Sequence, residues 1–183
     1  MNYYLDIKIL PDAEISGAVL MSAICSKLHK ALFDLEFSTV GISFPKVKVT
    51  LCDLLRLHGD EQSLRMFSTA NWLGGMSGYC RLSGILGVPI NTKHRTVSRK
   101  QSNMSESKLK RLLKRGSITE MEAKAYRAKM FASGLDNPYV ELVSASNGNR
   151  HRRYIEFGEL QDTPVEGVFD FFGLSKTATV PWF

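Results

Sequence analysis

The first apolar residues of the chain recur at every second position, which is the period of a half-buried β-strand. These residues are Tyr3, Leu5, Ile7 and Ile9. Pro11 follows and ends the strand. From about Gly17 to Glu36 the apolar residues change to helical spacing. The stripe that they form consists of Leu20, Ile24, Leu28, Leu32 and Leu35. The pattern therefore predicts a strand followed by a helix with one buried face.

Four further elements are predicted before residue 90. Val40–Phe44 and Leu51–Leu57 have the composition of short strands, and Asp60 can cap a helix that runs to about Phe67. Tyr79–Val88 is predicted to be the last strand, ended by Pro89. The order β-α-β-β-α-β is that of the ferredoxin-like fold, which recurs in RNA-binding proteins. We therefore predict an α+β protein with a ferredoxin-like domain over residues 1–90, although the usual aromatic RNA-recognition signature is absent.

Residues 91–183 are predicted to form a second α+β region. A helix is expected from about Ser105 to Arg115, where Gly116 follows it. The motif Thr119-x-x-Glu122 is a capping box, and it predicts a second helix that reaches about Phe131.

A β-hairpin is expected next, because the predicted strands Val140–Ser146 and Asn149–Phe157 flank the dipeptide Asn147-Gly148, a strong signal for a type I′ turn. With a two-residue turn, Ser146 would pair with Asn149, and Ser144 would lie opposite His151. The pattern therefore predicts two hydroxyl groups and an imidazole on one face, beside a basic region.

Positive charge is concentrated in one segment. Lys93–Lys129 contains twelve lysines and arginines and three acids, a net charge of +9, whereas residues 1–92 are neutral and residues 130–183 carry −3. In the predicted helix the leucines share one side, and Lys108, Arg111 and Arg115 lie on another. Localised charge of this kind favours a polyanion on one face, and we interpret the segment as a nucleic-acid-binding surface.

Two other interpretations of the basic segment stay open. It could be an amphipathic helix exposed to solvent, or it could belong to a DNA-binding regulator that places the helix in a duplex groove. The regulator would require a dimer or a helix-turn-helix, and neither is evident in the sequence. A DNA-binding protein would prefer duplex DNA, and an RNA-binding protein would prefer an RNA hairpin.

Composition narrows the functional classes. With 44% hydrophobic and 23% charged residues the chain has a globular composition, and no apolar run is long enough to cross a membrane. The start of the chain does not resemble a signal peptide, and three isolated cysteines disfavour a disulfide framework, so we expect a cytoplasmic protein. The four scattered histidines and the missing phosphate-loop motifs predict neither a metal site nor a cofactor.

Two histidines are candidates for acid–base chemistry. His29 lies beside the apolar stripe of the first helix, and His151 lies in the predicted hairpin. A nuclease without a metal can use the 2′-hydroxyl of RNA as its nucleophile, and it then needs a base and groups that hold the geometry. The residues alone do not decide between His29 and His151.

The chain resembles the CRISPR-RNA-processing endoribonuclease of subtype I-F systems along almost its whole length. The combination of Lys27-Leu28-His29 in the first helix with the terminal Pro181-Trp182-Phe183 is specific. The other matching stretches are Tyr4-Leu5-Asp6-Ile7, Leu20-Met21-Ser22, Gly41-Ile42-Ser43-Phe44-Pro45, Val97-Ser98-Arg99-Lys100-Gln101, Ser144-Ala145-Ser146-Asn147-Gly148 and Phe172-Gly173-Leu174-Ser175-Lys176.

The resemblance implies a metal-independent endoribonuclease that binds the stem-loop of the CRISPR repeat and cuts at the 3′ base of the stem. The upstream 2′-hydroxyl would attack, leaving a 2′,3′-cyclic phosphate and a 5′-hydroxyl. By this similarity His29 is the general base, and Ser144 and Ser146 hold the attacking ribose. Catalysis is expected where the first helix meets the hairpin. Retention of the product and assembly with the other subunits of the interference complex are also implied.

The same resemblance implies the RNA contacts. Arg99 and Gln101 match the residues that read a guanine edge at the foot of the stem. The basic helix matches the arginine-rich helix that lies along the stem. Its candidate RNA-binding residues are Lys108, Lys110, Arg111, Lys114 and Arg115.

Two positions depart from the family pattern. Phe172 replaces a tyrosine, so the ring can pack against the histidine but has no hydroxyl group. His151 takes the place of the aromatic residue that stacks on the terminal base pair. These departures leave a second interpretation, a non-catalytic subunit that binds the RNA hairpin in the same complex.

Overall fold

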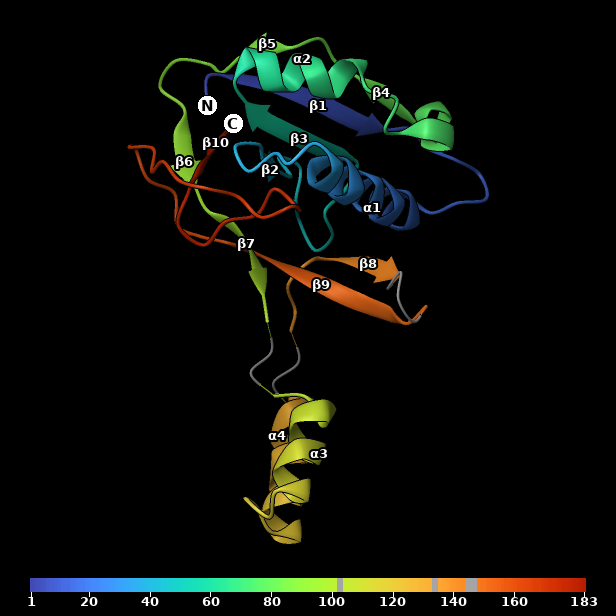
Figure 1. Ribbon diagram of the computed structural model, residues 1–183, viewed down its shortest axis with the longest axis vertical. Helices are drawn as coiled ribbons and strands as arrows, with labels where there is room; N and C mark the ends of the chain where they lie inside the picture. The colour runs from blue at the N-terminus through green and yellow to red at the C-terminus, as the bar shows by residue number, and fades with distance from the viewer. Residues whose placement is uncertain (102–103, 133–134, 144–147) are drawn as a thin grey trace.

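The structure is a computed structural model that describes residues 1–101, 104–132, 135–143 and 148–183. Its largest sheet contains β1 (Tyr3–Ile9), β2 (Gly41–Ser43), β3 (Leu54–Gly59) and β4 (Cys80–Leu82). These strands pair in the antiparallel order β2-β3-β1-β4, with helices α1 (Gly17–Asp34) and α2 (Glu61–Thr69) in the connections (Figure 1). The structure confirms the predicted α+β, ferredoxin-like arrangement.

The segment predicted as one last strand is divided. A 3₁₀ helix, η1 (Gly74–Tyr79), precedes β4, and a separate strand β5 (Leu86–Gly87) also pairs with β1. The segment between them leaves the ladder at Ser83, whose hydroxyl accepts a hydrogen bond from the Asp6 backbone N–H at 2.9 Å. A single strand over Tyr79–Val88 was therefore wrong.

Helix α1 begins at the predicted Gly17 and buries the predicted face, but it ends at Asp34, two residues before the predicted Glu36. The Ser16 hydroxyl caps its start by accepting a hydrogen bond from the Val19 N–H. The first four residues of the predicted stripe are buried, namely Leu20, Ile24, Leu28 and Leu32. They join one core cluster that also contains Val97, Val140, Ile155, Leu174 and Val180 from the second half of the sequence.

A three-stranded sheet lies on the other side of α1 (Figure 1). Its antiparallel order is β7 (Val97–Lys100), β9 (Arg150–Phe157), β8 (Tyr139–Val143). Helix α1 contacts β8, and the Glu141 N–H donates to the Ser22 hydroxyl at 3.0 Å. A third pair, β6 (Lys93–Arg95) with β10 (Val180–Trp182), brings the last residues of the chain beside the start of the basic segment.

The hairpin has a different register from the predicted one. Leu142, and not Ser144, stands opposite His151, and Val143 pairs with Arg150. The predicted pairing of Ser146 with Asn149 and the Asn147 position of the turn lie outside the described residues. Gly148 still has a positive φ of 67°, as a turn requires.

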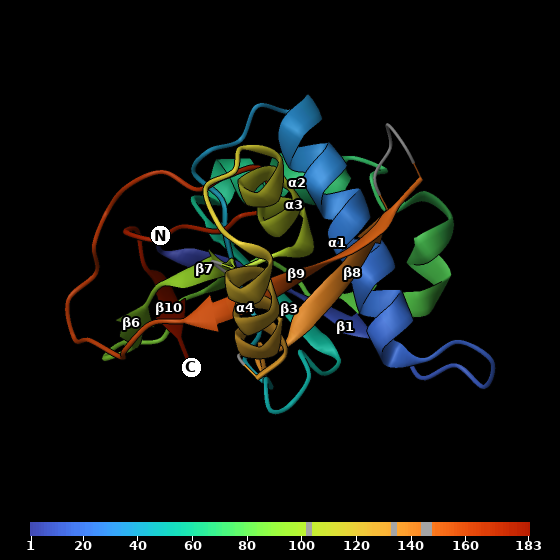
Figure 2. The ribbon, with the colours of Figure 1, turned by 90° about the horizontal axis from the view of Figure 1, so that it is seen from below.

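Two helices of the basic segment form an antiparallel hairpin that projects from the rest of the molecule (Figure 1), and in the view from below they stand in front of it (Figure 2). They are α3 (Glu106–Lys114) and α4 (Glu120–Ala132). The predicted capping box is present, with Thr119 and Glu122 joined by reciprocal hydrogen bonds. Leu109 and Ala123 are buried in the hairpin and are not part of the main core cluster. The leucine face of α3 therefore packs on α4.

Candidate active site

His29 lies in the last third of α1, beside a turn formed by Asp170–Leu174. The imidazole stacks on the Phe172 ring, with 3.7 Å between ring centres and 12° between the planes. Its Nδ1 atom is 2.8 Å from the carbonyl oxygen of Phe171. A ring stack and a backbone hydrogen bond together fix the orientation of the imidazole.

The hydrogen bond also selects the tautomer of His29. A carbonyl oxygen can only accept, so Nδ1 must carry the hydrogen and donate it. In the neutral imidazole the lone pair is then on Nε2. Nε2 is consequently the atom of His29 that can accept a proton.

The turn beside His29 is held by hydrogen bonds to the Asp170 carboxylate and to the Gly173 carbonyl. The Asp170 carboxylate accepts hydrogen bonds from the N–H groups of Phe172 and Leu174 at 2.8 and 3.0 Å. Gly173 has a positive φ of 69°, and its carbonyl accepts from the Ile42 N–H at 2.9 Å. The turn is thereby anchored to β2, and Phe172 is presented to α1.

Arg153 also contacts Phe172 and Asp170, and it was not among the residues predicted from the sequence. Its guanidinium carbon lies 3.4 Å from the centre of the Phe172 ring, and Nη1 is 3.7 Å from a carboxylate oxygen of Asp170. Since His29 stacks as closely on the same ring, the two groups must occupy opposite faces of it. A signal was present, because Arg153 lies at an inward position of an alternating strand, between His151 and Ile155.

The environment of Arg153 is unusual for a cation. Burial lowers the pKa of its guanidinium below the ordinary value, and the charge of Arg99 acts in the same direction. Its Nε atom is buried and has no hydrogen-bond partner within the described part of the chain. Arg153 is therefore held chiefly by packing on Phe172 and by the long contact with Asp170.

The other predicted catalytic residues, Ser144 and Ser146, lie outside the described residues. Arg99 is exposed on β7, opposite Ile155, and Gln101 is exposed just after the strand. His151 is exposed on β9. The structure therefore brings His29 and Phe172 into contact, and it places Arg99 on the same face of the sheet as Ile155.

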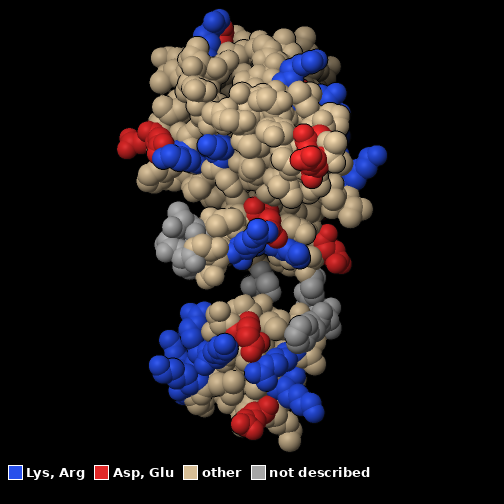
Figure 3. Space-filling model, turned by 90° about the vertical axis from the view of Figure 1, so that its right-hand side faces the viewer, with Lys and Arg blue, Asp and Glu red and all other residues tan. Residues whose placement is uncertain are grey.

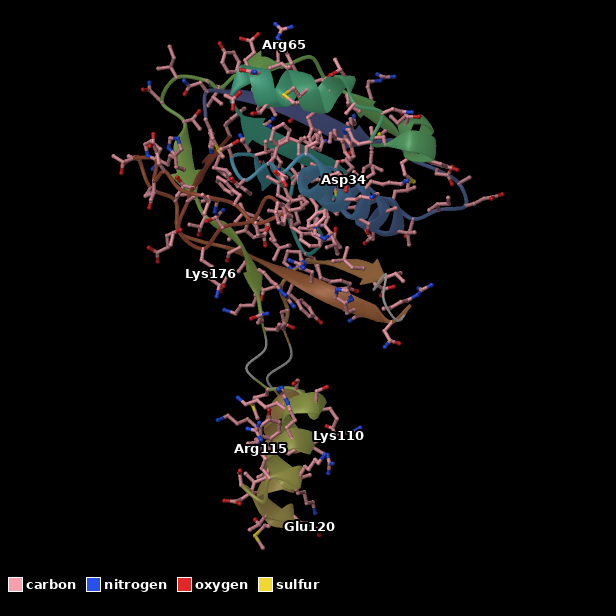
Figure 4. All side chains as sticks on the ribbon, in the orientation of Figure 1. Asp34, Arg65, Lys110, Arg115, Glu120 and Lys176 are labelled. Atoms are coloured by element: carbon pink, nitrogen blue, oxygen red, sulfur yellow. The ribbon has the colours of Figure 1, made fainter. Side chains whose placement is uncertain are left out.

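The predicted RNA-binding cations of α3 form a separate surface. Their side chains are exposed, and Figure 3 shows lysines and arginines gathered on the projecting helical hairpin. Figure 4 shows Lys110 and Arg115 on this hairpin, far from Asp34 at the end of α1. The helix itself is well terminated, since the Ser105 hydroxyl accepts from the Lys108 N–H and Gly116 has a φ of 65°.

Among the described residues, no three histidine, cysteine or acidic side chains gather closely enough to hold a metal ion. In the same part of the chain, no helix combines the length and the apolar character needed to span a bilayer.

Comparison with known proteins gives a consistent result. The family model for CRISPR-associated protein (Cas_Csy4) matches residues 4–183. Two curated proteins, each named CRISPR-associated endonuclease Cas6/Csy4, match the chain over the full length of both partners. The protein from Escherichia coli strain UTI89 is 38% identical over 184 residues, and that from Pseudomonas aeruginosa strain UCBPP-PA14 is 38% identical over 187 residues. The chain therefore belongs to the Csy4 family of CRISPR-associated proteins.

Proposed function

We propose that this chain is an endoribonuclease that cuts CRISPR precursor RNA at the 3′ base of the repeat stem-loop. The family and the names of its relatives support the substrate class. The observation that carries the chemistry is the 2.8 Å hydrogen bond from His29 Nδ1 to the Phe171 carbonyl, because it leaves Nε2 as a proton acceptor.

In the proposed reaction His29 Nε2 takes the proton of the 2′-hydroxyl just upstream of the cut. The 2′-oxygen then attacks the adjacent phosphorus, and the bond from phosphorus to the 5′-oxygen breaks. The 5′-oxygen leaves with the bonding electron pair and takes up a proton. The products are a 2′,3′-cyclic phosphate and a 5′-hydroxyl, and the step requires no metal ion or cofactor.

Phe172 supports this reaction as a positioning residue. It packs on the imidazole at 3.7 Å and so restricts rotation of the ring. Ser144 and Ser146 are proposed to hold the attacking ribose, an assignment that rests on the family resemblance alone.

We assign RNA binding to other residues. Arg99 and Gln101 would bind a guanine edge at the foot of the stem, where an arginine can make two parallel hydrogen bonds. His151 would stack on the terminal base pair. The basic residues of α3, which are Lys108, Lys110, Arg111, Lys114 and Arg115, would lie along the phosphates of the stem.

The wider role proposed here follows from the family. The protein would keep the cleaved hairpin bound and join the other subunits of the subtype I-F interference complex in the cytoplasm. The gene product would then act both in RNA processing and as a stable component of that complex.

The test is a cleavage assay with a CRISPR-repeat hairpin RNA in excess EDTA. We expect cleavage that disappears with a 2′-deoxy substitution upstream of the cut, and also with His29→Ala, while hairpin binding persists. Cleavage that requires a divalent ion, or that survives the 2′-deoxy substitution, would contradict the mechanism. Tight binding without cleavage by the wild-type protein would favour a non-catalytic hairpin-binding subunit.

A further inference from the structure

Two phenylalanines form an exposed aromatic pair next to His29. Phe33 and Phe171 meet edge to face, with 5.2 Å between ring centres and 75° between the planes. Phe33 is 58% exposed and Phe171 is 38% exposed, so much of both rings remains open to solvent. Contiguous exposed apolar surface, unlike a single scattered apolar residue, is typical of an interaction site.

The pair is tied to the candidate active site from both elements. The carbonyl of Phe171 is the group that binds His29 Nδ1, at 2.8 Å. Phe33 follows His29 by four residues in α1, which is about one helical turn or roughly 6 Å along the axis. Any nucleotide next to a phosphate at His29 therefore lies within reach of these rings.

We infer that Phe33 and Phe171 form a stacking subsite for the base of the first unpaired nucleotide on the 3′ side of the cut. The inference rests on the proposed function, since it takes the scissile phosphate to lie at His29. The nucleotide on the 5′ side belongs to the stem, and its base is occupied by pairing. The nucleotide on the 3′ side is single-stranded, and unpaired bases are the ones that stack on aromatic side chains.

The arrangement of the two rings suits this ligand. Rings that meet edge to face form a corner, in which a planar base can stack on one ring and touch the edge of the other. Stacking does not depend on hydrogen-bonding groups, so the subsite accepts any base and prefers purines, which have the larger face.

The subsite has a consequence for the reaction. The 3′ nucleotide carries the 5′-oxygen that leaves, and holding its base restrains that oxygen in line with the attacking 2′-oxygen. Once the bond is cut, this nucleotide is no longer linked to the hairpin. The stacking contact then holds only the released strand, and the hairpin product keeps its own contacts.

The test measures binding of an uncleavable hairpin, made with a 2′-deoxy substitution upstream of the cut. One RNA carries adenine at the first 3′ position, and a second carries an abasic residue there. For the wild-type protein we expect the abasic RNA to bind roughly 5- to 100-fold more weakly. Phe33→Leu keeps an apolar side chain without a ring, and it should weaken binding of the adenine RNA while leaving that of the abasic RNA unchanged.

The matched control is Val19→Ala. Val19 is on the same helix and is also 58% exposed, but it lies nearly three turns before His29. This variant should bind both RNAs as the wild type does. Phe171→Leu retains the carbonyl that binds His29, and it should reproduce the effect of Phe33→Leu.

Either of two results would overturn the subsite. One is equal affinity of the wild-type protein for the two RNAs. The other is a loss in Phe33→Leu that is the same for both, which would indicate a general effect or a protein partner at this surface. If the wild-type protein still cuts the cleavable hairpin, the proposed function stands without the subsite. A wild-type protein that neither binds nor cuts any hairpin would overturn both.

Discussion

The Arg153 guanidinium and the Phe172 ring are stacked at 3.4 Å. Because His29 lies on the other face of the ring, a cation from β9, an aromatic ring from the C-terminal turn and an imidazole from α1 form one column. The orientation of the candidate base therefore depends on residues that lie more than a hundred positions away in the sequence.

Replacing Phe172 by alanine should reduce the rate of RNA cleavage by about 10- to 100-fold, because the imidazole loses the surface that restricts its rotation. The affinity for the uncleaved hairpin should stay the same. Single-turnover kinetics and a binding titration would measure the two effects separately. Phe172→Tyr keeps the ring and is the control, with a rate within a few-fold of the wild type. An unchanged rate in Phe172→Ala would show that the stack is not needed.

Arg153 should contribute to stability more through its aliphatic and planar packing than through its charge. Arg153→Ala leaves space beside Phe172, and we expect a loss of about 1–3 kcal/mol in the free energy of unfolding. Arg153→Met fills the space without a buried charge and should stay within about 1 kcal/mol of the wild type. Urea unfolding measures both. If Arg153→Met proves as unstable as Arg153→Ala, the contact with Asp170 is the important one.

Gly173 should be irreplaceable in the turn that carries Phe171 and Phe172. Its φ of 69° disfavours any side chain, and an added Cβ would lie 2.6 Å from a methyl group of Ile42. We expect Gly173→Ala to slow cleavage at least tenfold and to lower stability by about 1–3 kcal/mol. Gly87→Ala is the control, because no atom lies within 4 Å of its added Cβ. A Gly173→Ala protein with normal turnover would contradict the role of the turn.

The cations of α3 should determine how strongly RNA binding depends on salt. Removing Arg111 and Arg115 together should weaken hairpin binding and reduce the slope of log affinity against log salt by about 1.4 to 1.8, if each contacts one phosphate. Lys8→Ala with Arg81→Ala removes the same charge from a pair of exposed residues on β1 and β4. That control should leave the slope close to the wild-type value. Equal slopes for both double variants would remove α3 from the RNA interface.

His58 should make stability depend on pH. It is fully buried and bonds the Ser43 hydroxyl through Nε2 at 2.8 Å, and its pKa is held well below 6.5 by burial, with the charge of Arg56 adding to the effect. The folded protein thus keeps His58 neutral, whereas the unfolded chain takes up a proton below about pH 6.5. The contribution of neutral His58 to the free energy of unfolding is therefore fully present above about pH 6.5. Below that pH the free energy of unfolding should fall by about 1.4 kcal/mol per pH unit.

Chemical unfolding between pH 7.5 and 5.0 checks this expectation. In His58→Gln the slope should largely disappear, and in His151→Gln, which changes an exposed histidine, it should remain. A wild-type protein with constant stability over this range would contradict it. Asp60, whose pKa is lowered by hydrogen bonds from Ser63, affects stability at more acidic pH.

Local signals were sufficient for most of the elements. The alternation of β1, the stripe of α1, the cap at Asp60 and the capping box at Thr119 all depend on neighbours in the sequence, and the structure confirms them. The hairpin register could not be predicted in the same way. It is set by the pairing of Leu142 with His151 within a sheet that also contacts α1, and the local Asn147-Gly148 signal does not encode that pairing.

The site shows the same limit. The family resemblance selected His29 and Phe172, and the structure adds their contact. Arg153 and the Phe33–Phe171 pair become visible only when the C-terminal turn is placed against α1, because their significance lies in contacts between distant segments. For Arg153, the one sign in the sequence was its inward position in an alternating strand.

The helical hairpin of α3 and α4 packs its own leucine and alanine, and its Lys110 and Arg115 stand well apart from helix α1, which carries His29 (Figure 4). If the hairpin binds the RNA stem as proposed, substitutions on its surface change which stem is held without altering the groups at His29. During divergence of the family, the hairpin would then follow a drifting repeat sequence while His29 and Phe172 stay under separate selection.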